Sequence, residues 1–174
     1  MTLVATPEVF LHPGEWHFGA APGRIGTLLG SCVSVTLWHP HHHFGGMCHI
    51  LLPGRLRSHS HSHTHTHSNS APLDGRFADE AMELLANEIH ARHATPASCQ
   101  VKLFGGGNMF SGTRAGGMDV GRRNIEATRH ALARHGLVPM NEHVGGTTRR
   151  RLHFDLSTGH VWLALPEHDQ PVSK

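Results

Sequence analysis

The sequence lacks any run of about 18 consecutive apolar residues, the length that a membrane-spanning helix requires. It also lacks, at its N-terminus, the basic segment followed by an apolar segment that is typical of a secretory signal peptide. Neither membrane insertion nor export is therefore expected. We predict a cytoplasmic protein.

An excess of charge of one sign is missing as well. The 174 residues include 15 Lys and Arg against 13 Asp and Glu, a formal net charge of +2 with neutral histidines. Nucleic-acid-binding domains usually carry a basic stripe with interleaved aromatic residues, and the sequence has no such stripe. Nucleic acid is therefore excluded as an expected partner.

Cysteine is scarce, with three residues in a chain long enough to bury the core of one domain. An odd number of cysteines argues against a disulfide framework and fits a reducing compartment. The thiols are therefore expected to be free.

Alternating apolar and polar residues, the period of a strand, run through residues 33–38. The next strand is expected at 46–52, and another begins at Val101 and ends in three glycines. Residues 152–165 predict a hairpin, because Ser157-Thr158-Gly159 is a typical turn between two alternating segments. These strands are short and not separated by regular helices.

Two main helices are expected among these strands. Asp74 is predicted to cap the first, whose apolar face consists of Ala78, Ala81, Met82, Leu85 and Ile89. The second runs from about Arg123 to Arg134, with Gly136 as its C-terminal stop. Helices packed on short mixed strands predict a layered α+β fold, with residues 1–166 as a single domain.

Cys32 and His49 are the residues that could carry chemistry. Cys32 precedes the strand at 33–38, and His49 lies on the next strand. A thiol has a pKa of about 8.5 and becomes a good nucleophile when a paired imidazole activates it. The alternative is that Cys32 is a small core residue, as cysteines in Val-rich strands usually are. Sequence separation does not decide, because catalytic partners meet in the fold.

Small residues surround the candidate nucleophile. Gly30 and Ser31 suit a tight turn whose N–H groups could face a developing oxyanion. Gly105 and Gly106 belong to a glycine segment without the Lys and Ser or Thr of a phosphate-binding loop. We interpret this segment as a close backbone approach near the site, where a larger residue would block a substrate. Cys48 should point away from His49 and into the core, because adjacent strand residues face opposite sides.

Several segments, in the same order along the chain, resemble the CheD family of chemoreceptor glutamine deamidases. They are Leu11-His12-Pro13-Gly14-Glu15, Leu29-Gly30-Ser31-Cys32-Val33, Gly45-Gly46, residues 49–53, residues 75–82, residues 102–107, Gly121-Arg122-Arg123-Asn124, and Gly145-Gly146 with Arg149 or Arg150. The resemblance covers nearly the whole chain apart from both tips and one insertion.

The resemblance implies a cysteine-dependent amidohydrolase that converts receptor glutamines to glutamates through a thioester. Cys32 corresponds to the family's nucleophile, His49 to its base and Thr27 to a site threonine that orients the imidazole. A threonine that merely bonds to backbone is the structural alternative for Thr27. The implied partners are chemoreceptor cytoplasmic domains and a CheC-type phosphatase, and no metal or organic cofactor is implied.

The insertion at 57–70 alternates histidine with serine or threonine and contains no apolar residue that could join a core. It is expected to be a mobile loop, and 167–174 a flexible tail. Clustered imidazoles bind Zn, Cu and Ni well. Besides a deamidase, the sequence therefore leaves open a non-catalytic chemotaxis adaptor and, more weakly, a metal-binding protein built on Cys32, Cys48, His49 and the histidine tract.

Overall fold

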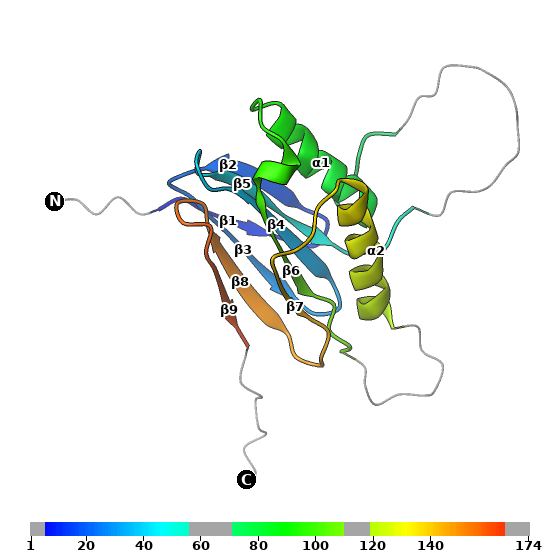
Figure 1. Ribbon diagram of the computed structural model, residues 1–174. Helices are drawn as coiled ribbons and strands as arrows, with labels where there is room; N and C mark the ends of the chain where they lie inside the picture. Colours follow the sequence, from blue (N-terminus) through cyan, green and yellow to red (C-terminus); the bar gives the residue numbers. More distant parts are fainter. Residues whose placement is uncertain (1–5, 56–70, 110–118, 166–174) are drawn as a thin grey trace, which may run out of the picture.

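Residues 6–55, 71–109 and 119–165 are described by the computed structural model of the chain (Figure 1). The predicted insertion at 57–70 and the predicted tail at 167–174 lie outside these residues. The described part combines two mixed β-sheets with two helices. The predicted α+β class is therefore confirmed.

The strands form two sheets, which we call the first and the second sheet. The first has the order β1-β3-β8-β9, with β1 (Glu8–Leu11), β3 (Arg24–Leu29), β8 (Arg150–Asp155) and β9 (Val161–Ala164). The second has the order β2-β5-β4-β6-β7, with β2 (Trp16–Ala20), β5 (Phe44–Ile50), β4 (Val33–His39), β6 (Gln100–Gly105) and β7 (Asn141–Val144).

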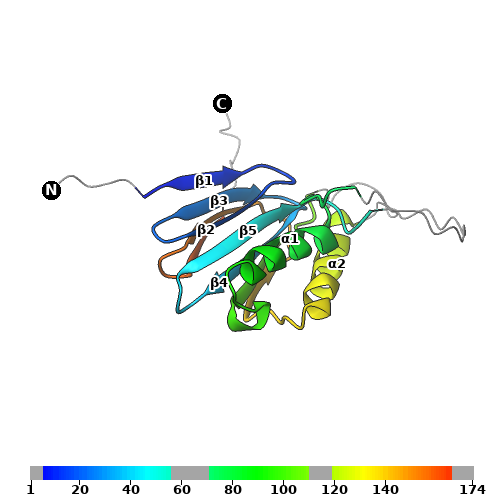
Figure 2. The ribbon, with the colours of Figure 1, turned by 90° about the horizontal axis from the view of Figure 1, so that it is seen from above.

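Three layers result, in which the second sheet lies between the first sheet and the helices (Figure 2). Helix α1 (Ala78–His90) packs on β5, and α2 (Val120–Arg134) packs on β4. The large core cluster lies between helices and second sheet and includes Val33, Val35, Leu37, Cys48, Ile50, Met82, Leu85, Ile89 and Leu132. A smaller cluster between the sheets includes Leu11, Ile25, Trp38, Met47, Phe154 and Leu156.

The two central strands β4 and β5 are buried along their whole lengths. Their alternating side chains therefore face two different layers. Cys48 belongs to the cluster under the helices, whereas its neighbour Met47 belongs to the cluster between the sheets. The prediction that Cys48 points into the core is confirmed.

Helix α1 buries its predicted apolar face, but the starting points of both helices differ from the predictions. The residue at the N-cap of α1 is Phe77, which makes no capping side-chain bond. Asp74 is therefore not the cap. Its carboxylate instead accepts a hydrogen bond from the N–H of Arg76 and pairs with the Arg76 guanidinium. Helix α2 begins at Val120, because the Asp119 carboxylate accepts from the N–H of Arg122 at 2.9 Å.

The strands β1, β2, β3 and β7 were not predicted, since each is short and their sequences lack a clear period of two. The predicted C-terminal hairpin is confirmed as β8 and β9, which pair antiparallel. Gly136, with a φ of +68°, ends α2 as expected. Among the described residues, no helix has the length and apolar character needed to cross a membrane.

Candidate active site

The turn between β3 and β4 consists of Gly30, Ser31 and Cys32, all partly exposed. The Cys32 carbonyl accepts a hydrogen bond from the N–H of Gly106 at 2.7 Å. The Gly30 carbonyl accepts one from the N–H of Gly107 at 2.9 Å. The glycine segment after β6 therefore holds the turn that carries the candidate nucleophile.

Side chains cannot replace hydrogen in this glycine segment. A Cβ atom at Gly105 would collide with the Cys32 carbonyl, and Gly105 has a φ of +102°. A Cβ atom at Gly106 would collide with the side chain of Ile125 on α2. The predicted close backbone approach is thus present, and what it approaches is the turn before β4.

The main-chain N–H groups around Cys32 differ in whether they already make a hydrogen bond. The N–H of Gly106 is already bonded to the Cys32 carbonyl. Within the described residues, neither Ser31 nor Cys32 has its N–H bonded to another group. Two free N–H groups beside a thiol are the arrangement that an oxyanion hole requires. Ser31 and Cys32 are therefore better placed as oxyanion donors than Gly105 or Gly106.

His49 is anchored through both its backbone and its side chain. Its N–H donates to the Glu15 carbonyl, and its own carbonyl accepts from the N–H of Gly14, both at 2.9 Å. The imidazole Nδ1 lies 2.8 Å from the Thr27 hydroxyl oxygen. Since Thr27 is on β3 and His49 on β5, this contact joins the two sheets.

The Thr27 hydroxyl determines which imidazole nitrogen carries the proton. The hydroxyl has one hydrogen, which it donates to the Leu11 carbonyl at 2.8 Å. Its oxygen must therefore accept from the Nδ1–H of His49. The other nitrogen, Nε2, then has a free lone pair and is the basic atom of the ring. Thr27 does more than bond to backbone, because it also fixes this tautomer.

Cys32 and His49 lie on the same face of the second sheet. Ser34 is paired with His49 across β4 and β5, and Cys32 is two residues before Ser34. Diagonal neighbours within a ladder have Cβ atoms roughly 7 Å apart, and Cys32 lies one residue before this ladder begins at Val33. The His49 Nε2 atom is buried and makes no hydrogen bond within the described residues, so the thiol is not bonded to it.

Burial shifts the pKa values of both groups towards their neutral forms. Burial lowers the pKa of His49 to about 4, against smaller raising effects from the Leu11 carbonyl and the Glu15 carboxylate. Burial raises the pKa of the Cys32 thiol, which packs against the apolar cluster of Leu29, Phe104 and Leu152. The expectation that the imidazole lowers the thiol pKa is therefore not met in this structure. Burial therefore favours the neutral form of both the thiol and the imidazole.

Burial raises the pKa values of the other two thiols further than that of Cys32. Burial raises the pKa of Cys48 to about 12 and that of Cys99 to about 11. Cys48 also faces the helices, whereas His49 faces the first sheet. Cys32, Cys48 and His49 therefore cannot converge on one metal ion. Across the described ranges, no three His, Cys, Asp or Glu side chains gather as metal ligands, and the histidine tract lies outside those ranges.

Asn124 on α2 is a further site residue. The sequence indicated it only as part of the family motif at residues 121–124. Its side chain is fully buried. Its amide nitrogen donates to the carbonyl of Leu51 at 2.8 Å and to that of Ser31 at 3.3 Å. Ser31 adjoins Cys32, and Leu51 follows His49 by two residues. One amide therefore links the turn carrying the thiol to the strand carrying the imidazole.

Comparison with known proteins shows the family to which the chain belongs. The family model described as CheD chemotactic sensory transduction matches residues 52–165. A protein of Dechloromonas aromatica named "Probable chemoreceptor glutamine deamidase CheD 3" is 50% identical over 160 residues, which are 92% of this chain and 88% of the relative. The chain belongs to the CheD family. The resemblance drawn from the sequence motifs is thereby confirmed.

More distant CheD relatives also match most of the chain. A CheD protein of Pseudomonas savastanoi is 44% identical, with 93% of this chain and 86% of the relative covered. One of Leptospira interrogans is 35% identical, with 92% and 94% covered. Both carry the name "Probable chemoreceptor glutamine deamidase". The family model begins after His49, but the match with the Dechloromonas protein leaves about 14 residues uncovered (174 − 160) and so spans Cys32 and His49.

Proposed function

We propose that this CheD protein deamidates glutamine side chains of chemoreceptor cytoplasmic domains, with Cys32 as nucleophile and His49 as base. The observation that carries the proposal is the contact between Thr27 and the imidazole Nδ1. It leaves a free Nε2 lone pair on the same sheet face as the thiol. A core histidine with a purely structural role would be expected to use both nitrogens.

In the first half of the reaction, a thioester forms. His49 Nε2 takes the proton of the Cys32 thiol as the sulfur attacks the side-chain amide carbon of the substrate glutamine. The carbonyl oxygen becomes an oxyanion, which the N–H groups of Ser31 and Cys32 stabilise, each worth about 3 kcal/mol by analogy with known oxyanion donors. The imidazolium then protonates the leaving nitrogen, and ammonia departs.

In the second half, water hydrolyses the thioester. His49 Nε2 removes a proton from water, which attacks the acyl carbon and releases glutamate and the thiol. The sum is glutamine plus water to glutamate plus ammonia. Because the resting thiol is neutral, its proton moves during the attack, when the substrate excludes water and brings the sulfur towards Nε2.

The proposal is tested by incubating the protein with chemoreceptor cytoplasmic fragments and mapping glutamine-to-glutamate changes by mass spectrometry. We expect defined glutamines to be converted, with one ammonia released for each. The Cys99→Ala variant is the matched control, since it removes a partly exposed thiol away from the site. Conversion that persists in Cys32→Ala would overturn the assignment of the nucleophile.

A second role implied by the family resemblance is binding to a CheC-type phosphatase. A protein that acted only as an adaptor would not need a buried imidazole held in one tautomer, so the site favours catalysis. The adaptor role makes a separate prediction, because Cys32→Ala should still bind the phosphatase. Receptor cytoplasmic domains as substrates would place both roles in the cytoplasm.

A further inference from the structure

The outer face of the first sheet is uncovered among the described residues (Figure 2). The second sheet packs on the inner face, where Thr27 and Leu29 point. Large apolar side chains remain partly exposed on the outer face, among them Phe10, Leu28 and Trp162. Trp162 is 51% exposed and lies under the Arg24 guanidinium, with 5.7 Å between that carbon and the ring centre.

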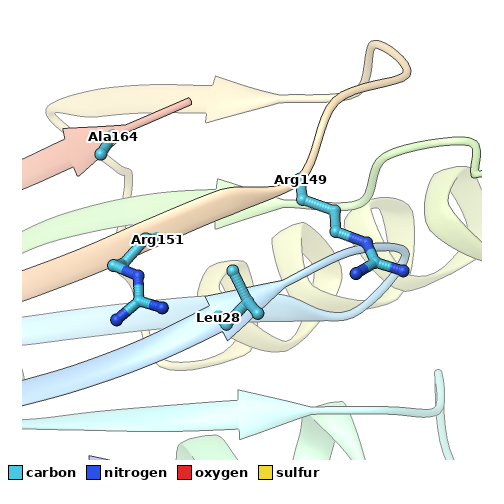
Figure 3. Close-up of a pocket in the computed structure, with 4 residues that line it drawn as sticks. All are labelled: Leu28, Arg149, Arg151 and Ala164. Atoms are coloured by element: carbon cyan, nitrogen blue, oxygen red, sulfur yellow. The ribbon is translucent and has the colours of Figure 1, made fainter. Parts of the chain in front are cut away.

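One end of this face is hollowed. A hollow of about 270 Å³ is lined by Leu28, Arg149, Arg151 and Ala164 (Figure 3). The strand register brings these residues together, because Arg151 is paired with Leu28 on β3 and with Ala164 on β9. We call this hollow the arginine pocket.

The arginine pocket lies at the end of the sheet that carries the nucleophile. Leu28 is the penultimate residue of β3, and the turn with Cys32 begins directly after that strand. Figure 3 shows the Arg149 side chain reaching towards the chain that leaves β3. The residue before Arg149 also borders the site, since a Cβ atom at Gly107 would lie 3.4 Å from the Thr148 carbonyl.

No described acidic residue compensates the charges of the arginine pocket. Among the described residues, the side chains of Arg149 and Arg151 make no hydrogen bond or ion pair, and no acidic side chain lines the hollow. Several arginines elsewhere are ion-paired. For example, Arg24, Arg129 and Arg55 are paired with Asp155, Glu142 and Glu80. Two unpaired guanidiniums beside an apolar wall attract a carboxylate, which guanidinium geometry suits.

We propose that the arginine pocket binds an acidic side chain of the receptor segment that carries the target glutamine. The inference rests on the proposed function, and it names a determinant of substrate recognition. The exposed apolar side chains along the same face fit a protein partner better than a free anion, which would leave them uncovered.

Single charge reversals test the pocket. We would measure kcat and KM on a receptor cytoplasmic fragment for Arg149→Glu, Arg151→Glu and the control Arg134→Glu. Arg134 is exposed on the last turn of α2, so the control makes the same charge change on another element. Each pocket variant should raise KM about tenfold or more with little change in kcat, and should weaken the dependence of KM on salt. The rate of Cys32 alkylation should stay unchanged.

Binding separates failure of the pocket from failure of the proposed function. The dissociation constant of the fragment would be measured with Cys32→Ala, alone and combined with each charge reversal. Tight binding that both pocket reversals weaken, without any deamidation by the wild type, would overturn the function and support the pocket. Equal affinity for the pocket variants and the Arg134→Glu control, or no binding at all, would overturn the pocket.

Discussion

The two faces of the second sheet differ in chemistry although the same strands form them. Towards the helices, β4 and β5 present mainly apolar side chains, including Val35, Cys48 and Ile50. Towards the first sheet, the same strands present Ser34 and the imidazole of His49, and Cys32 lies in the turn just before β4. A shift of one residue in register would exchange the two sets.

Alternate residues of β4 and β5 face opposite layers. Residues that stabilise the core and residues of the candidate site therefore occupy neighbouring positions on the same strands. Residues one position apart should respond differently to substitution. Changes on the helix side should lower the free energy of unfolding and leave catalysis intact. Changes on the side of the first sheet should affect catalysis first. Each prediction below breaks or sharpens this contrast.

The largest expected effect is the contrast between Cys32→Ala and Cys48→Ala. Cys32→Ala should lower kcat by about 10⁴-fold or more, because loss of a nucleophile removes the covalent route. Cys48→Ala should keep nearly full activity but lose about 1 kcal/mol of stability, the usual cost of deleting one small buried group. Deamidation assays and urea unfolding measure the two quantities. Comparable activity of the two variants would break the contrast.

Thr27→Val should lower kcat by roughly 10- to 100-fold, because it removes the acceptor that fixes the Nδ1–H tautomer of His49. Thr27→Ser, which keeps the hydroxyl, should retain most of the activity and serves as the matched control. KM should change little in both variants. If Thr27→Val and Thr27→Ser are equally active, the hydroxyl has no role in orienting the imidazole.

The buried imidazole should make stability depend on pH. Its pKa is about 4 in the folded protein and 6.5 ordinarily, so the unfolded state binds more protons between these values. Stability is therefore complete above the ordinary pKa and decreases as the pH falls towards 4. Between about pH 7 and about pH 5 the wild type should lose ~2 kcal/mol more than His49→Leu. Urea unfolding at both pH values measures this difference, and parallel curves would contradict it.

The smallest expected effect concerns Asn124 on α2, which links the turn carrying Cys32 to the chain after β5. Asn124→Ala removes the bonds to the Ser31 and Leu51 carbonyls and should lower kcat about tenfold, with a stability loss of about 1–2 kcal/mol. Thr128→Val is the control, because the Thr128 hydroxyl bonds only within α2, to the Asn124 carbonyl. If both variants lose the same activity, Asn124 acts through stability alone.

The sequence predicted those parts of the fold in which local patterns are strong. The alternation at 33–38 and the apolar face of α1 depend on neighbouring residues, and both were predicted correctly. The Asp74 cap was wrong because Arg76 draws that carboxylate away from the helix start. Strands β1 to β3 were not predicted, because they are stabilised more by pairing with distant partners than by a local sequence pattern.

The candidate site was only partly predictable for a related reason. Cys32 and His49 were recognisable from their residue types and motifs, but Thr27 lies on a different sheet, so only family resemblance pointed to it. The role of Asn124 depends on where α2 packs. The arginine pocket depends on the register of β3 with β8 and β9. Spacing along the chain encodes none of these contacts.

Alkylation of the three cysteines in the native protein tests the separation of the two faces most directly. Iodoacetamide labelling over a range of pH, with each site quantified by mass spectrometry, would give three separate rates. The structure predicts that Cys32 reacts first, at a rate that rises with pH because burial raises its pKa. Cys99 should follow, and Cys48 should react only on unfolding. Labelling of Cys48 in the folded protein as fast as Cys32 would contradict the account.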